Sequence, residues 1–582
     1  MLDGVSGARV AIIGGGISGL AAAWFLRQSL GPGAQVVVLE KQPVVGGHLR
    51  VSDVAGLPVD EGAESLLARR PEAVDLARAV GLGDDIVHPA AVGAGLWSRG
   101  AIVPLPTGTV MGVPADPAQL AGVLTPGEVA AAIARDASPP GLSVEEDVAI
   151  GRLVRSRYGD AVADRLVEPL LGGVYAGRAD ELSLDATVPV LGAAVREART
   201  LGEAVAAAGR PGAGPGAAPP ATETSRDEPE TTSADEPSAG AGGMSRPVRV
   251  GGPPYGRAPT PSAALAGTPT DETAAGEPGD APPEGPEETS ADEPSAGAGG
   301  MSRPVRVGGP PYGRAPTPSA AAASPVFAGV VGGVGRLPGA VAAASGADVR
   351  TGVTVRALER TPAGWRLVTG PVPEPSVLEV DAVVVATPAV AAARLLASAA
   401  PAAAAELGAV EAASMAIVTL ALPAGGFPAA PSSSGFLVPP VDGRTVKAVT
   451  FSSAKWPWLG GRAGGLVLLR ASLGRHGEAR DLQRDDDELV AAALADVRAA
   501  TGYAGGVVDS RVTRWGGALP QYAVGHLDRV ARVRAAVDAV PGLAVCGAVY
   551  DGVGVAACVG AAREAVGRVA AYLSERRARI ET

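Results

Sequence analysis

The chain has 582 residues, of which 47% are hydrophobic, and its formal net charge is −12. A chain of this length can form two to four domains with large cores, and its acidic balance argues against a nucleic-acid partner. The two cysteines, Cys546 and Cys558, do not form a C-x-x-C pair, and no two of the four histidines have metal-ligand spacing, so neither a dithiol redox centre nor a metal site is expected.

The N-terminus leads into its first predicted strand within ten residues, which leaves no room for a signal peptide. The sequence also has no uncharged apolar run of about 18–20 residues, the length that spans a bilayer. We therefore expect a cytoplasmic protein, and a peripheral contact with a membrane stays open.

The first forty residues predict a dinucleotide-binding unit. Residues 9–13 (RVAII) form a β-branched run that leads directly into GGGISGL, and a helical stretch follows. The three positions of a G-x-G-x-x-G loop are filled by Gly14, Gly16 and Gly19. The first glycine permits a tight turn, the second lets the backbone approach a pyrophosphate, and the third lets helix and strand pack closely. A purely structural turn is the alternative, because the chain has 81 glycines.

A second strand and an acidic residue follow at the expected distance. Residues 35–39 (QVVVL) end at Glu40, 21 residues after Gly19, where a carboxylate can accept hydrogen bonds from an adenosine ribose. The N-terminus of the intervening helix would face the phosphates with its unpaired N–H groups. Gly46 and Gly47 come shortly after Glu40, an arrangement that resembles flavoproteins in which a second glycine turn covers the pyrophosphate of FAD.

The next stretch alternates strands and helices. Residues 56–70 predict a strand, a glycine turn and the start of a helix, which residues 71–82 continue. Residues 96–114 contain three prolines and predict strand and loop, whereas residues 117–190 carry helical patterns.

Residues 206–324 differ in kind from the rest. They are dominated by Pro, Gly, Ala, Glu, Ser and Thr, and they hold −7 of the net charge. Such a composition buries too little apolar surface to offset chain entropy, so we expect a disordered insert. Residues 232–264 recur without change as residues 289–321, which indicates a duplicated linker. Each copy contains SRPVRVGGPPYGR, for which a short recognition motif is the alternative to a neutral spacer.

Regular structure is predicted to resume at Val326, with a glycine turn feeding a helix over residues 327–340. Strands are expected at residues 348–358, 365–368 and 381–387, a second sheet at 416–422, 447–452 and 465–471, a helix at 486–501, a last strand at 543–546 and a final helix from Gly560.

These patterns predict an α/β protein with a discontinuous Rossmann-like FAD-binding domain, a mixed-sheet substrate domain, a helical subdomain and a long disordered insert. The FAD-binding domain takes residues 1–75, 325–400 and 530–582. The helical and substrate subdomain takes residues 76–205, the insert 206–324 and the substrate-binding sheet 401–529.

The whole chain outside the insert resembles the flavin-dependent protoporphyrinogen and coproporphyrinogen oxidases of the amine-oxidase-like superfamily. The superfamily is signalled by VAIIGGGISGL, VVLEK, GGHLR and GAVYDGVGV. The porphyrinogen branch is signalled by DEGAES, LPTGTVMGVP, LPQYAVGH and above all EPLLGGVYAGRADELSL at residues 168–184.

The resemblance implies a set of cofactor-binding residues. Those that would bind the adenosine and the pyrophosphate are Gly14, Gly15, Gly16, Ile17, Ser18, Gly19, Glu40, Lys41, Gly46 and Gly47. Those that would line the flavin side or cover the isoalloxazine ring are Gly62, Ala63, Ser65, Val553, Gly554 and Val555, and Val355 would hold the adenine through its backbone.

The implied reaction is a six-electron aromatisation in three two-electron steps, each passing a hydride from the macrocycle to flavin N5. Oxygen would reoxidise the flavin and be released as peroxide. The flavin carries the redox chemistry, and we assign no side chain as a catalytic base. The backbone of Gly172 or Gly173 is a candidate for placing a carbonyl near the reacting carbon.

Four arginines are candidates for pairing with substrate propionates: Arg69, Arg70, Arg99 and Arg178. A guanidinium can bind a carboxylate through two parallel hydrogen bonds, although each could equally be a solvated surface residue. Because coproporphyrinogen III carries four propionates and protoporphyrinogen IX two, this cationic set favours coproporphyrinogen III, with protoporphyrinogen IX as the alternative. More distant alternatives are a flavin amine oxidase, a polyene desaturase, and a non-catalytic FAD- or porphyrin-binding protein.

The composition of the insert predicts that it is dispensable for chemistry. Joining Val205 to Pro325 through a short Gly/Ser linker should leave the flavin absorbance spectrum and the turnover number nearly unchanged. Steady-state kinetics on the shortened chain check this, and a collapse of folding or activity would show that the insert packs on the core.

Overall fold

The computed structural model describes residues 7–90, 93–210 and 325–581. Almost all of the predicted insert lies outside the described residues. Its first residues do not: Ala206–Ala208 belong to helix α9 (Leu201–Ala208), because three alanines continue the helix up to Gly209. The predicted boundary at 206 is therefore corrected, and the junction of the shortened chain belongs after Arg210.

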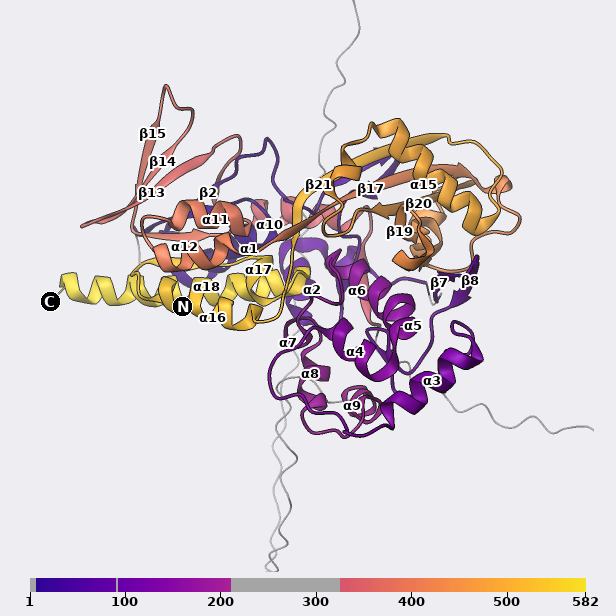
Figure 1. The fold of residues 1–582 in the computed structure, drawn as a ribbon. Coiled ribbons are helices and arrows are strands. Elements are labelled where there is room, and N and C mark those ends of the chain that lie inside the picture. The colour runs from indigo at the N-terminus through magenta and orange to yellow at the C-terminus, as the bar shows by residue number, and fades with distance from the viewer. Residues whose placement is uncertain (1–6, 91–92, 211–324, 582) are drawn as a thin grey trace, which may run out of the picture. The chain divides into compact units, whose positions relative to one another are not determined.

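A five-stranded parallel sheet carries the predicted dinucleotide loop (Figure 1). Its strands, in spatial order, are β12 (Asp348–Arg350), β2 (Gln35–Leu39), β1 (Arg9–Ile13), β16 (Ala382–Val385) and β22 (Leu543–Val545). All four pairings are parallel. Segments from both ends of the chain thus form one sheet, which confirms the predicted discontinuous α/β fold.

Alternate residues of each strand face opposite sides of this sheet. On one side, Val10 and Ile12 of β1 share a core with α1 (Ile17–Leu30), α10 (Leu337–Ser345) and α18 (Val555–Glu581). On the other side, Ala11 and Ile13 pack with α11 (Ala389–Leu396), α12 (Pro401–Gly408), α16 (His526–Asp538) and the antiparallel strands β13 (Val355–Thr361), β14 (Gly364–Thr369) and β15 (Ser376–Val380). The sheet is therefore covered on both faces, as parallel sheets generally are.

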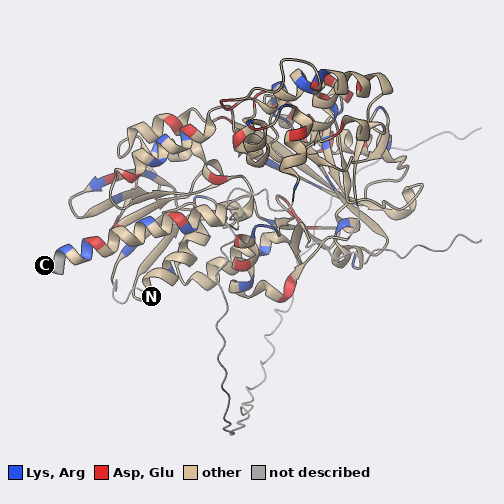
Figure 2. Cartoon of the chain, turned by 90° about the horizontal axis from the view of Figure 1, so that it is seen from below, with Lys and Arg blue, Asp and Glu red and all other residues tan. Residues whose placement is uncertain are grey.

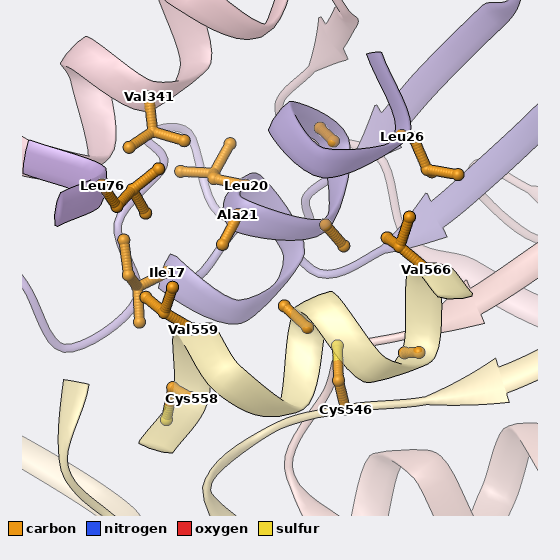
Figure 3. Close-up of a cluster of buried hydrophobic side chains, with 14 of the residues drawn as sticks. Ile17, Leu20, Ala21, Leu26, Leu76, Val341, Cys546, Cys558, Val559 and Val566 are labelled. Carbon is orange, nitrogen blue, oxygen red and sulfur yellow. The ribbon is translucent and has the colours of Figure 1, made fainter. Parts of the chain in front are cut away.

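Helices α1 and α18 pack directly against each other. Figure 3 shows Ile17 of α1 beside Val559 of α18, whereas Leu20 of α1 lies near Leu76 and Val341. Helix α18 begins at Val555, five residues before the start we predicted at Gly560, because the alanines that follow Val555 favour helix. The earlier start brings the positive end of α18 to the GVGV stretch.

The second large sheet of the protein is mixed and has seven strands. Its order is β21 (Asp509–Pro520), β17 (Ala412–Pro423), β20 (Leu466–Leu473), β19 (Val446–Thr450), β18 (Gly435–Leu437), β7 (Ala94–Ser98) and β8 (Ala101–Pro104). The three strands predicted for this sheet are confirmed, and β7 joins it through parallel pairing with β18. Helix α15 (Asp486–Thr501), confirmed to the residue, buries Leu489, Ala493 and Val497 in the core of this sheet.

The segment predicted to be helical surrounds a core of its own. It contains α3 (Pro126–Asp136), α4 (Ile150–Tyr158), α6 (Glu168–Tyr175), α8 (Pro189–Val195) and α9, whose apolar faces meet in one cluster. After the insert the chain returns as β11 (Phe327–Val330), between β5 (Leu66–Leu67) and β6 (Ile86–Val87). Within the described ranges, no helix combines the length and apolarity needed to cross a bilayer.

Basic and acidic residues are interspersed over the described ribbon (Figure 2). One of the buried charged residues is a lysine. Lys447 lies at an irregularity in the pairing of β19 with β20, and only 3% of it is exposed. Its Nζ has no hydrogen-bond partner. Burial, reinforced by the charge of Arg475, lowers the pKa of Lys447 to about 7.

Replacing this lysine should stabilise the protein. The folded-state pKa of about 7 lies below the ordinary value of 10.5, so protonation of Lys447 costs stability progressively as the pH falls from 10.5 to 7. Lys447→Met should therefore raise the free energy of unfolding by about 1–4 kcal/mol at neutral pH, and the gain should vanish above pH 10.5. Denaturant titrations at several pH values measure this, with the exposed Lys41→Met as control. An equal gain at all pH values would contradict the argument.

Candidate functional site

The glycine loop between β1 and α1 is fixed by close contacts within the protein. Gly14 has φ +111°, and a Cβ on it would lie 2.6 Å from the carbonyl oxygen of Ala386. A Cβ on Gly19 would lie 1.9 Å from the carbonyl oxygen of Gly14. Gly16 is different, because its φ of −72° and ψ of 177° suit any residue and a Cβ there would meet no protein atom within 4 Å. The space beside Gly16 is therefore open to a ligand.

The N-terminus of α1 faces this space with unpaired donors. The first intrahelical hydrogen bond runs from Leu20 N–H to Gly16 O (3.0 Å), so the N–H groups of Ile17, Ser18 and Gly19 have no partner in the helix. The N-cap has no side-chain hydrogen bond, and the first turn has no acidic residue. These donors and the positive end of the helix dipole form an anion site suited to a pyrophosphate.

The second glycine turn lies directly against the first. Gly46 N–H donates to Gly15 O (2.8 Å), and Gly16 and Gly46 form a parallel bridge. A Cβ on Gly47 would lie 3.3 Å from the Cα of Gly16. The structure thus brings together both turns that we predicted to surround the pyrophosphate.

Glu40 is buried at the end of β2. Its Oε2 accepts from Gly15 N–H and its Oε1 from Gln42 N–H, both at 2.7 Å. Each carboxylate oxygen keeps a further lone pair for a ribose hydroxyl. Val353 N–H donates to Glu40 O (2.9 Å), which places the start of β13 and Val355 next to the acid. Lys41 is exposed.

The residues predicted for the flavin side converge on the same region from two directions. Gly62 packs on the second glycine turn, because a Cβ on it would lie 1.8 Å from the carbonyl oxygen of His48. Ala63 and Ser65 follow in the same loop. Val555, at the start of α18, packs against the core that contains Ile17, whereas Val553 packs against the helical core.

The two glycines of α6 differ in their surroundings. The carbonyl of Gly172 accepts from Ala176 N–H (3.0 Å) in the αL cap of the helix, so it is already engaged. Gly173 is exposed, and a Cβ on it would lie 3.4 Å from Leu437 of β18. Of the two, Gly173 is the better candidate for contact with a substrate.

The four candidate arginines do not gather in one place. Two of them already have carboxylate partners: Arg99 donates to both oxygens of Glu128 (2.7 and 2.8 Å) and to Val123 O, and Arg70 pairs with Glu72 (2.7 Å). Arg69 and Arg178 are exposed and make no ion pair with any described residue. We therefore rank Arg178 and Arg69 above Arg99 and Arg70 as propionate ligands.

The structure adds an ion cluster that the sequence patterns did not indicate. The side chain of Glu64, in the loop after β4 (Leu57–Asp60), is 10% exposed and lies between Lys455 Nζ (2.6 Å) and Arg470 Nη1 (3.0 Å). Glu64 and Lys455 are separated by 391 positions in the sequence. The available signals were the charged residues inside the apolar patterns FSSAKWP and LVLLRAS.

Comparison with known proteins gives the family. The model described as flavin containing amine oxidoreductase matches residues 17–201 and 297–570. The chain belongs to this family. Membership confirms the predicted FAD cofactor and the oxidoreductase class, and the open space beside Gly16, with its unpaired donors and the buried Glu40, fits the pyrophosphate and ribose of FAD.

Named relatives cover the whole chain. It is 33% identical to the coproporphyrinogen III oxidase of Mycobacterium tuberculosis, over 98% of both chains, and 25% identical to that of Bacillus subtilis, over 97% of this chain and 98% of the relative. A solved structure from Exiguobacterium, named as a candidate protoporphyrinogen oxidase, shares the fold with a TM-score of 0.70 and 24% identity, over 98% of this chain and 100% of that one. The cyclohexylamine oxidase of Brevibacterium oxydans does so with a TM-score of 0.59 and 16% identity, over 97% and 99% of the two chains.

Gly16→Val separates binding from folding. The protein leaves room for the new side chain, whereas a pyrophosphate at the end of α1 would not. The variant should purify folded, with the melting temperature of the wild-type apoprotein, and without FAD by absorbance at the flavin band. Gly19→Ala is the control, because its Cβ meets Gly14 O and should destabilise the apoprotein. If Gly16→Val retained stoichiometric FAD, the predicted cofactor position would be wrong.

Proposed function

We propose that this chain is an FAD-dependent coproporphyrinogen III oxidase that forms coproporphyrin III in haem biosynthesis. The observation that carries the proposal is the similarity along the whole chain to proteins of that name, at 33% identity over 98% of both chains. The residues that resemble the porphyrinogen branch, 168–184, form α6 and the turn after it, which pack against the seven-stranded sheet.

In the proposed reaction the macrocycle loses six electrons and six hydrogens in three turnovers, with oxygen as acceptor and peroxide as product. FAD, when bound, supplies the two-electron acceptor of each turnover. The chain's residues position the reactants: the α1 N-terminus and Glu40 would hold the dinucleotide, and α6 would lie along the macrocycle with Gly173 toward it. Aromatisation of the ring supplies driving force, so orientation and exclusion of water are the protein's main tasks.

The charges around α6 support a substrate with many carboxylates. Arg178 follows α6, with its Nη2 3.9 Å from where a Cβ on Gly477 would lie. The loop that contains Gly477 bonds to the end of α6 through His476 N–H and Ala176 O (2.6 Å). Arg475 in this loop is 9% exposed, and its Nη2, like Nζ of Lys447, has no hydrogen-bond partner. The incompletely paired guanidinium of Arg475 would attract propionates to Arg178.

Protoporphyrinogen IX is the second candidate substrate. The protoporphyrinogen oxidase 2 of Arabidopsis thaliana is 32% identical over 195 residues, but these cover only 33% of this chain. Full-length similarity therefore favours coproporphyrinogen III.

Competition between the two porphyrinogens tests the substrate. We expect a higher kcat/KM for coproporphyrinogen III, and Arg178→Ala should reduce the preference about tenfold, because a charge-assisted hydrogen bond contributes about 1.5–3 kcal/mol. Arg99→Ala is the matched control and should change the preference less, because Arg99 is already paired with Glu128. A higher kcat/KM for protoporphyrinogen IX would refute the substrate, and an unchanged preference in Arg178→Ala would refute the mechanism of recognition.

A further inference from the structure

The loop over residues 62–65 presents unpaired backbone donors. The N–H groups of Ala63, Glu64 and Ser65 donate to no acceptor among the described residues, and Ala63 is exposed. The other polar groups of the loop, in contrast, are bound to neighbouring elements of the protein. The loop's three other residues, Gly62, Glu64 and Ser65, each make a side-chain or carbonyl contact with the seven-stranded sheet or the helix that follows β19.

The centre of this attachment is the carboxylate of Glu64. It accepts hydrogen bonds from Lys455 Nζ (2.6 Å) and Ser452 Oγ (3.0 Å), and it lies 3.0 Å from Arg470 Nη1. Burial would raise the pKa of Glu64, but the charges of Lys455 and Arg470 outweigh it and lower the pKa to about 2. The carboxylate is therefore ionised at neutral pH, and both ion pairs are present there.

The two cations each make a second contact with the loop, Lys455 with a side chain and Arg470 with the backbone. Lys455 Nζ lies 2.8 Å from Ser65 Oγ, and Arg470 Nη2 donates to the carbonyl of Gly62. In a trans peptide the N–H points opposite to the C=O. Because Arg470 holds the carbonyl of Gly62, the N–H of Ala63 is directed away from the sheet. The contact with a guanidinium also polarises this peptide and makes its N–H a stronger donor.

The loop lies where the redox end of the cofactor is expected. Gly62 packs on His48, and Gly47 packs on Gly16 at the phosphate-binding end of α1. Glu40, the predicted ribose ligand, lies on the other side of Gly15. A dinucleotide that extends from Glu40 past Gly16 would reach the 62–65 loop next.

We propose that Lys455 and Arg470 are positioning residues of the flavin site, which aim the N–H of Ala63 at the isoalloxazine ring and thereby raise its reduction potential. A hydrogen-bond donor near the ring stabilises the electron density that the ring gains on reduction. The proposal rests on the predicted position of FAD and is independent of which porphyrinogen is oxidised.

The test compares Lys455→Met and Lys455→Arg in the FAD-loaded protein. Lys455→Met removes the bonds to Glu64 and Ser65, so the reduction potential of FAD should fall, and sulfite, which adds to electron-poor flavins, should bind about tenfold more weakly. Lys455→Arg should recover most of both properties. The control is Arg462→Met, which removes an exposed cation over the ring of Trp458 (6.0 Å) and should change neither.

Lys455→Met with bound FAD and with the potential and sulfite affinity of the wild type would overturn the proposal. Should that variant not fold, Ser65→Ala decides, because it removes only the contact with Lys455 and keeps the buried ion pair. A smaller shift of potential in the same direction supports the proposal, and no shift overturns it. Potential and sulfite affinity are measured without a porphyrinogen, so a wrong substrate assignment would leave these results intact.

Discussion

Helix α1 lies so close to strand β1 that a single methyl group at Gly19 would overlap the carbonyl of Gly14. This contact sets the distance between the helix and the sheet. It therefore also sets the position of the unpaired N–H groups in the first turn of the helix. Helix α18 packs on α1 through Val559 and Val566, and β22, which precedes it, completes the sheet (Figure 3). The packing of β22 and α18 on the N-terminal sheet and helix therefore fixes the position of the C-terminal segment. The GVGV stretch lies at the start of α18, so its position is fixed as well.

One segment joins the seven-stranded sheet to the dinucleotide-binding part at several points. Residues 53–65 bond to β21 through Trp515 Nε1 and Glu61 O (2.9 Å), to β20 through Arg470, and to the residues after β19 through Lys455. A buried ion cluster is costly to desolvate and is worth little for stability alone. The cluster instead fixes the relative positions of the segments that it joins, because each ion can satisfy all of its partners in only a few positions. The seven-stranded sheet and the loop over residues 62–65 are thereby held in a fixed position relative to each other.

Much of the fold could be predicted from sequence because its signals are local. The strand–glycine–helix order, the distance to Glu40 and the capped helix at residues 486–501 each depend on neighbours within a few turns. The pairing of Arg99 with Glu128, and of Glu64 with Lys455 and Arg470, depends on which distant segments become neighbours. A charged residue in an apolar strand such as LVLLRAS predicts that a partner exists, but not which one. For this reason the structure of the glycine loop was predictable, whereas the free or paired state of the arginines was not.

The two cysteines gain a meaning from the product of the proposed reaction. Both thiols are buried: Cys546 Sγ lies 3.9 Å from Ser18 O in the first turn of α1, and Cys558 Sγ lies 3.9 Å from Gly552 O. Burial raises the pKa of both thiols, that of Cys558 to about 11. Peroxide attacks the thiolate and not the thiol. If the proposed reaction forms peroxide within the protein, the packing that seats α18 on α1 would also keep both sulfhydryl groups in their unreactive form.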